Sequence, residues 1–227
     1  MPTHNSHVET TSVQTDSRIV SARTLAARLL PKAVPSVVFA GLLWLATAAG
    51  TIPIPGSPVP ITLQTFVVML AALTLDWRQA AGAVVLYLSM GAAGLPVFAN
   101  GGSTLSLVGP SAGFLFGFLP AVLVTAALKG RRPAAQSGQS VQSGQSIQSV
   151  QSGRALRTVL TVTRYLVAAI AGCIVVDYVF GILVQAWLTR LPLTTVFAAS
   201  MTFVPGDLLK AVIASLSAAG ILKLTRR

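Results

Sequence analysis

The sequence is poor in charged residues, and in acidic ones most of all. Only 9% of its 227 residues are charged, and Asp and Glu together number 5, against 16 Lys and Arg. A soluble domain carries roughly 25% charged residues, so this chain has too few to cover a water-facing surface. Hydrophobic residues make up 53% and form bilayer-length runs. Together these features predict a polytopic membrane protein.

Histidine and cysteine are almost absent. Cys173 is the single cysteine and stands inside an apolar run, while His4 and His7 lie in the polar N-terminal segment. These positions offer neither a disulfide nor a metal-ligand spacing. The sequence also contains no GxxxxGK[ST] phosphate-binding loop and no Ser–His or Cys–His set. We therefore expect neither an enzyme, nor a metal site, nor a cofactor; any ATP must be used by another subunit.

Six apolar segments predict an all-α membrane fold of six transmembrane helices. The expected spans are residues 33–50, 59–75, 80–95, 110–128, a stretch within 158–188, and 204–224. They divide the chain into a basic, polar tail (1–32) expected to be disordered, transmembrane helices 1–4 (33–128), a linker (129–157), helices 5–6 (158–224) and a basic C-terminal end (225–227). Residues 1–32 show no cleavable secretory signal.

The linker contains a low-complexity repeat. Residues 136–153 are six consecutive triplets that each begin with Gln-Ser. The repeat has too little apolar surface to offset the entropy lost on ordering. We therefore expect it to be a disordered connection between the two halves.

The basic residues predict the orientation. With both termini in the cytoplasm, the tails, the linker and the turn around Arg78 hold 13 of the 16 basic residues, and the outer loops hold only Arg190. The positive-inside rule therefore predicts cytoplasmic termini. It also explains the net charge of +11 without nucleic acid.

Three connections on the expected outer side are irregular and apolar. Residues 51–60 read TIPIPGSPVP, residues 91–113 are rich in glycine, and residues 192–207 end in FVPGD. Non-helical backbone at membrane depth is tolerated where it is buried in protein or lines a cavity. Tight turns would explain any one segment, but all three together favour an outward-facing ligand pocket.

Asp207 and Lys210 are the sharpest candidate pair. Standing at i and i+3 in PGDLLKAV, they share a helix face. Ionisable residues within a span usually mark function or a paired charge. Alternatively, Asp207 caps the helix and Lys210 extends to the interface. Asp177, in CIVVDYVF, is a further acidic residue within a span, and the sequence gives it no role.

Four segments, in this order, resemble signature segments of the BioY family, the biotin-binding S components of energy-coupling factor transporters. They are PVPITLQTFVVMLAAL (58–73), GAAGLPVFANGG (91–102), GPSAGFLFGF (109–118) and FVPGDLLKAVIAS (203–215). The resemblance covers about residues 35–127 and 160–222. It implies a six-helix bundle in the bacterial cell membrane that binds biotin for uptake. The implied partners are a transmembrane coupling protein and two ABC-type ATPase subunits.

The resemblance also implies site residues. The family contacts its ligand through the Asp and Lys of PGDLLK and through an Asn near GLPVFA, which here are Asp207, Lys210 and Asn100. Biotin presents ureido N–H donors, a carbonyl acceptor, an apolar bicycle and a carboxylate. Asp207 and Asn100 suit the ureido group, and aromatic side chains suit the bicycle. The remaining candidates for the pocket wall are Phe98, Phe114, Gln64, Thr62 and Thr65.

Three alternatives stay open from the sequence. One is an S component for a different vitamin, such as thiamine or riboflavin. A second is an intramembrane enzyme that uses Asp177 or Asp207. The third is a structural membrane protein without a ligand.

Overall fold

The computed structural model describes residues 33–54, 57–130 and 147–224, with side chains described from 156 to 221 in the last range. The expected tail (1–32), the C-terminal end (225–227) and much of the expected linker (129–157) lie outside this part of the chain. The first helix is Ala33–Ala48. The elements after it are α2 (Gln64–Thr74), α3 (Trp77–Ala92), the short 3₁₀ turns η1 (Ala99–Gly101) and η2 (Thr104–Leu107), α4 (Ala112–Leu128), α5 (Ile147–Ala169), the π-helical segment η3 (Ile170–Val176), α6 (Asp177–Thr189), α7 (Leu193–Ser200), the 3₁₀ turn η4 (Met201–Phe203) and α8 (Val204–Leu224).

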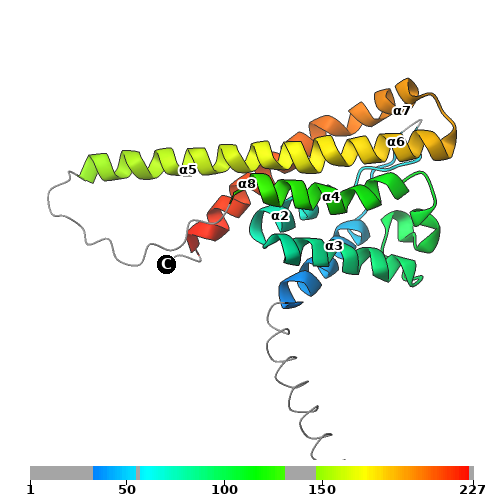
Figure 1. The fold of residues 1–227 in the computed structure, drawn as a ribbon, viewed down its shortest axis with the longest axis horizontal. Helices are drawn as coiled ribbons and strands as arrows, with labels where there is room; N and C mark the ends of the chain where they lie inside the picture. Colours follow the sequence, from blue (N-terminus) through cyan, green and yellow to red (C-terminus); the bar gives the residue numbers. More distant parts are fainter. Residues whose placement is uncertain (1–32, 55–56, 131–146, 225–227) are drawn as a thin grey trace, which may run out of the picture.

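Two continuous helical stretches dominate the bundle. α5, η3 and α6 form one long helix across the molecule, and α7, η4 and α8 run back along it (Figure 1). Within them, Leu156–Thr189 has 34 residues and contains an 18-residue stretch of mean hydropathy 2.4, and Leu193–Ile221 has 29 residues and contains an 18-residue stretch of mean hydropathy 1.5. Both are long and apolar enough to cross a membrane. Shorter apolar helices are Ala33–Ala48, Gln64–Thr74 and Ala112–Leu128.

Small residues allow the helices to approach closely. α4 packs against α6 and η3, while α2 packs against α8. On α8, Ala211, Ala214 and Ala218 are fully buried. On α4, a Cβ at Gly113 would lie 2.7 Å from the Phe180 carbonyl oxygen, so only glycine fits without a shift. Such close approach is a main source of helix association in lipid.

Lys129 ties α4 to α2 and is buried, although the sequence placed it in the cytoplasmic linker. Its ammonium group donates hydrogen bonds to the carbonyl oxygens of Ala72, at 2.6 Å, and Leu75. The last carbonyl groups of a helix have no partner within the helix, and they carry partial negative charge. Lys129 therefore caps the C-terminal end of α2 from a neighbouring helix.

The structure differs from the sequence interpretation at three places. The helix expected at 59–75 begins only at Gln64, because Ile61 pairs with Ile52 through two backbone hydrogen bonds of 2.9 Å. Pro60 therefore precedes the helix instead of opening it. The segment 192–207 was expected to be irregular but contains α7 and η4, which lead directly into α8. α5 begins at Ile147, inside the range assigned to the linker.

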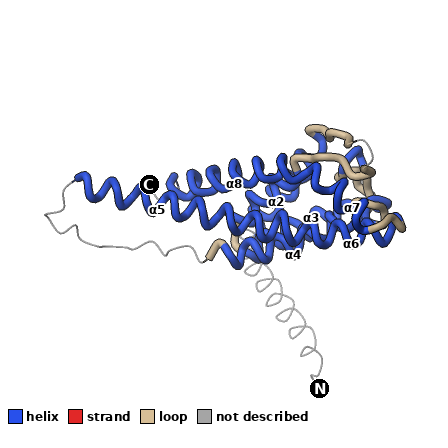
Figure 2. The backbone as a smooth tube through the Cα atoms, turned by 90° about the horizontal axis from the view of Figure 1, so that it is seen from above, coloured by secondary structure: helices blue, strands red, loops and turns tan. Residues whose placement is uncertain are grey.

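Irregular segments gather at one end of the bundle, where α6 and α7 meet (Figure 2). These loops and the ends of α2, α4, α6 and α8 line a cavity. The fold thus brings the segments at 57–63 and 93–111 together with the start of α8.

Candidate functional site

A cavity of about 230 Å³ lies at the loop-rich end of the bundle. Its wall combines apolar and aromatic side chains with a few polar ones, as small-molecule sites do. The lining residues come from the loop before α2, the start of α2, the η1–η2 region, α4, α6, η4 and α8.

Every site residue predicted from the sequence lines this cavity. The set is Asp207, Lys210, Asn100, Phe98, Phe114, Gln64 and Thr62, together with Thr65. They come from separate segments, the outermost of which, at Thr62 and Lys210, are 148 positions apart, so their convergence is a property of the fold.

Asp207 and Lys210 form an ion pair on the first turns of α8. Lys210 Nζ lies 2.8 Å from Asp207 Oδ1, as the i, i+3 spacing predicted. Both side chains are largely buried, with exposed fractions of 6% for Asp207 and 13% for Lys210. The carboxylate also stands in the first turn of its helix, where the positive end of the helix dipole favours it.

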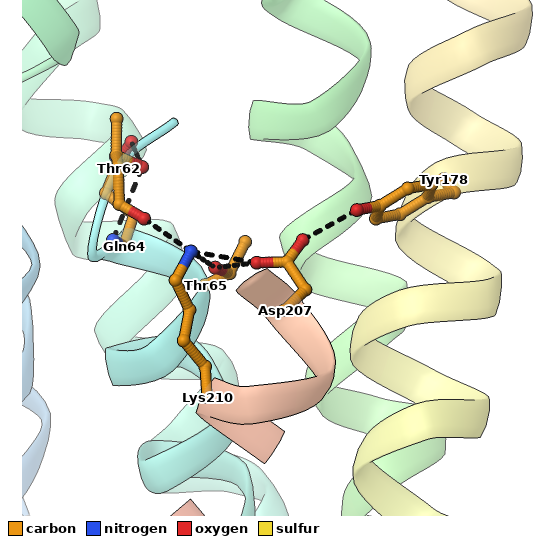
Figure 3. Close-up of polar contacts among 6 residues, drawn as sticks. All are labelled: Thr62, Gln64, Thr65, Tyr178, Asp207 and Lys210. Atoms are coloured by element: carbon orange, nitrogen blue, oxygen red, sulfur yellow. Dashed lines mark hydrogen bonds and ion pairs between the residues drawn. The ribbon is translucent and has the colours of Figure 1, made fainter. Parts of the chain in front are cut away.

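Other elements hold the pair in place (Figure 3). Lys210 Nζ also donates to the Thr62 carbonyl oxygen at 2.7 Å and to Thr65 Oγ1 at 3.0 Å. Thr65 Oγ1 in turn lies 2.9 Å from Asp207 Oδ1, and the Tyr178 hydroxyl donates to Asp207 Oδ2 at 2.7 Å. Hydrogen bonds to a charged group are stronger than neutral ones. The network therefore joins α8 to the start of α2 on one side and to α6 on the other.

Aromatic rings form the apolar part of the wall. Phe114 meets Tyr178 and Phe203 edge-on, with ring centroids 6.1 and 6.4 Å apart. Phe98 is buried and makes an edge contact with Tyr87 at 5.2 Å. These rings present a rigid, flat surface suited to an apolar ring system.

Asn100 lies at the exposed edge of the cavity. Its φ of 57° is in the left-handed region, which Asn tolerates better than most residues. The Thr51 hydroxyl donates to Asn100 Oδ1 at 2.6 Å, and the amide N–H₂ group has no partner among the described residues.

Gln64 and Thr62 line the floor of the cavity, the part of its wall beside the ion pair. Gln64 is buried, and its amide nitrogen donates to the Tyr87 hydroxyl, which itself donates to the Val97 carbonyl oxygen at 2.8 Å. The Thr62 hydroxyl donates to Gln64 Oε1 at 3.2 Å. Much of the hydrogen-bonding capacity of Gln64 is thus used inside the protein.

Sequence reasoning missed Tyr178 and Phe203 and gave Asp177 no role in ligand binding, although all three line the cavity. The signal for Tyr178 was its position next to an acidic residue within a span. The direction of the Tyr178 side chain depends on η3, where each helical turn is wider than in an α-helix, and no local sequence pattern predicts such a turn.

The wall can bind a ligand that has both an apolar ring body and hydrogen-bonding edges. It provides the Asp207–Lys210 ion pair, the amide of Asn100 and a second carboxyl group, that of Asp177. Among the described residues, no group of three or more His, Cys, Asp or Glu could hold a metal ion.

Comparison with known proteins gives a consistent result. Residues 17–227 match the family model described as "BioY family". A "Biotin transporter BioY" from Rhizobium etli is 40% identical over 160 residues, covering 70% of this chain and 75% of that protein. Another with this name, from Rhodobacter capsulatus, is 36% identical over 194 residues, covering 80% and 87%.

The fold also has a solved counterpart. A crystal structure of "the S-component for biotin from an ECF-type ABC transporter" matches with a TM-score of 0.70 over 87% of this chain and 93% of that chain. Sequence identity is 20%, so this match shows the fold alone. The family match extends over most of the chain, and the Rhizobium etli protein passes 30% identity with broad coverage of both sequences. The chain therefore belongs to the BioY family.

Proposed function

We propose that this chain captures biotin at the outer face of the cell membrane and serves as the substrate-binding subunit of an energy-coupling factor transporter. The observation that carries the proposal is the buried Asp207–Lys210 pair, held by two other helices at the wall of a cavity with an aromatic lining. The family and the names of its relatives point to the same ligand. Charged and polar groups at these positions fix the orientation of a ligand whose bulk is apolar.

In this proposal Asp207 accepts a hydrogen bond from a ureido N–H of biotin. Its Oδ1 already accepts from Thr65 and Lys210, whereas Oδ2 accepts only from Tyr178 and keeps a free lone pair. Lys210 balances the charge of Asp207 and orients it.

The other predicted residues complete the wall. Phe98 and Phe114 cover the bicycle, Gln64 and Thr62 set the floor, and the free amide of Asn100 donates to the ligand at the edge.

Energy for uptake comes from partner subunits in this proposal. The sequence contains no phosphate-binding loop, and transport against a gradient needs an energy source. We propose a transmembrane coupling protein with two ABC-type ATPases as that source. The basic residues support cytoplasmic termini, since Arg78 and Lys129 lie at helix ends opposite the cavity and Arg190 ends α6 near it.

The test is calorimetric titration of detergent-purified protein, stripped of endogenous ligand, with biotin. We expect one-to-one binding by the wild type. Replacing Asp207 with Asn should weaken it by about 2–5 kcal/mol, because the substitution breaks a desolvated, hydrogen-bonded charge pair. The methyl ester of biotin reports how much the ligand carboxylate contributes.

Two results would contradict the proposal. Absence of heat from folded wild-type protein would rule out biotin and lead to a panel of other vitamins, including thiamine and riboflavin. Wild-type affinity in the Asp207→Asn variant would leave biotin as the ligand but would remove Asp207 from its site.

A further inference from the structure

Asp177 is a second acidic residue on the cavity wall, and the site described above gives it no partner. It is the first residue of α6, and only 1% of its surface is exposed. Its Oδ1 atom is buried and accepts no hydrogen bond from any described residue. Buried polar atoms are nearly always hydrogen-bonded, so an unpartnered one in a residue that lines a cavity calls for an explanation.

The surrounding helices are shaped to hold this carboxyl group. A Cβ on Gly117 of α4 would overlap Asp177 Oδ1, so the glycine leaves the space that the oxygen fills. The π-helical segment η3 ends at Val176, immediately before Asp177. Such a segment changes the direction of the residues after it relative to a regular α-helix, and it is frequent at functional sites.

The wall provides no cation for Asp177. Lys210 is the only basic residue among those that line the cavity, and it is held by Asp207, Thr62 and Thr65. A buried charge without a partner carries a penalty of several kcal/mol. The neutral acid avoids this penalty, and it offers an O–H donor beside a C=O acceptor.

We propose that Asp177 is a second ligand-binding carboxyl group, which pairs as a neutral acid with adjacent N–H and C=O groups on one edge of a cyclic urea. This inference rests on the proposed function, because biotin carries such an edge. The acid carbonyl accepts the ureido N–H, and the acid hydroxyl donates to the ureido oxygen. Asp207 then binds the other ureido N–H, so both nitrogen atoms of the ligand are engaged.

The test uses full-length protein and three ligands: biotin and two isomeric derivatives of it, each methylated at a different one of the two ureido nitrogens. In the wild type, both isomers should bind at least tenfold more weakly than biotin, since each loses one N–H donor. Equal affinity of either isomer and biotin would overturn the proposal without any variant.

Two substitutions of Asp177 sharpen the test. Asp177→Val removes both hydrogen-bonding atoms and should weaken biotin binding by about 10- to 100-fold. Asp177→Asn keeps a donor beside an acceptor and should stay within about tenfold of wild type. Asp177→Val should bind the isomer methylated at the nitrogen that pairs with Asp177 as tightly as it binds biotin. It should still bind the other isomer more weakly than biotin, because that isomer has lost the N–H that pairs with Asp207.

Gln185 supplies the matched control. It lies on the same helix, is buried, and also has an unpartnered oxygen, but it does not line the cavity. Gln185→Leu should leave the affinity for biotin unchanged.

The outcomes separate this inference from the proposed function. If the wild type binds no biotin, both fall together. If the wild type binds biotin and Asp177→Val binds it equally well, only the role of Asp177 is overturned. A uniform loss for all three ligands, with both methylation penalties intact, would likewise overturn it, because it would indicate a structural role.

Discussion

Tyr178 is the residue through which α6 acts on the charged pair. Its hydroxyl donates to Asp207 Oδ2 at 2.7 Å, and its ring packs edge-on against Phe114. One side chain therefore contributes both to the polar network and to the aromatic wall.

Replacing Tyr178 with Phe should separate these two contributions. The ring stays, while Asp207 loses one hydrogen bond, which typically contributes about 1.5–3 kcal/mol when a charged group is involved. We expect biotin affinity to fall by roughly tenfold or more, because Asp207 is then less firmly held. Titration calorimetry measures this change. Tyr165→Phe is the control, since Tyr165 is buried but does not line the cavity, and an equal loss there would contradict the assignment.

The site residues also show which contacts can be predicted from the sequence and which cannot. Asp207 and Lys210 stand on one helix three positions apart, so their pairing follows from local geometry. The hydrogen bond from Tyr178 to Asp207 joins two helices, α6 and α8, and depends on where tertiary packing places them. No short-range pattern contains that information.

At the scale of elements, the helix cores were easier to predict than the segments between them. Apolar runs located the helices, but proline suggested a helix start at Pro60 and an irregular chain at 192–207. Pairing of Ile52 with Ile61 and packing of α7 against α6 decided both cases. These contacts are tertiary, and local propensity does not encode them.

Lys129 gives a prediction about stability alone. Lys129→Met should lower the free energy of unfolding by about 1–3 kcal/mol, because the carbonyl groups at the end of α2 lose their donor in a buried setting. Biotin affinity should not change, because Lys129 does not line the cavity. A thermal melt in detergent with and without biotin measures both quantities.

The control is Arg157→Met, at an exposed position. Equal melting temperatures for the two variants would show that the ammonium group does not support α2.

Glycines on helices allow a second test of packing. A methyl group at Gly172 would overlap the Thr125 hydroxyl and lie 2.6 Å from the Ala121 carbonyl oxygen, whereas Gly220 has no atom within 4 Å of the same position. Gly172→Ala should therefore destabilise the protein by about 1–3 kcal/mol. Gly220→Ala should be neutral or stabilising, by up to about 1 kcal/mol. If melting temperatures fall equally, close contact between η3 and α4 does not explain the role of Gly172.

For the whole molecule, the cavity lies at one end of the bundle, and Arg78, Lys129 and Arg157, among the described basic residues, lie toward the other end. Leu105 is 81% exposed in the η2 turn at the cavity end, and Arg157 is exposed in the N-terminal half of α5. The single native cysteine, Cys173, is buried, so an added cysteine can be labelled selectively.

Labelling of intact cells tests the proposed orientation. A membrane-impermeant thiol reagent should modify Leu105→Cys from outside, and Arg157→Cys only after the membrane is permeabilised. The unmodified chain should remain unlabelled in both conditions. Labelling of Arg157→Cys in intact cells, without labelling of Leu105→Cys, would mean that the positive-inside assignment is inverted.

The π-helical segment η3 has a consequence for comparing this chain with its relatives. Each residue of an α-helix advances the facing direction by about 100°, so one residue more or fewer before Asp177 would turn Asp177 and Tyr178 to another side. Hydropathy would hardly register that difference, because the whole stretch is apolar. Sequence alignments that place gaps only in loops would then pair cavity-facing positions with lipid-facing ones. The cavity-facing residues of this helix therefore have to be matched between relatives by superposing structures, with an insertion or deletion allowed inside the membrane span.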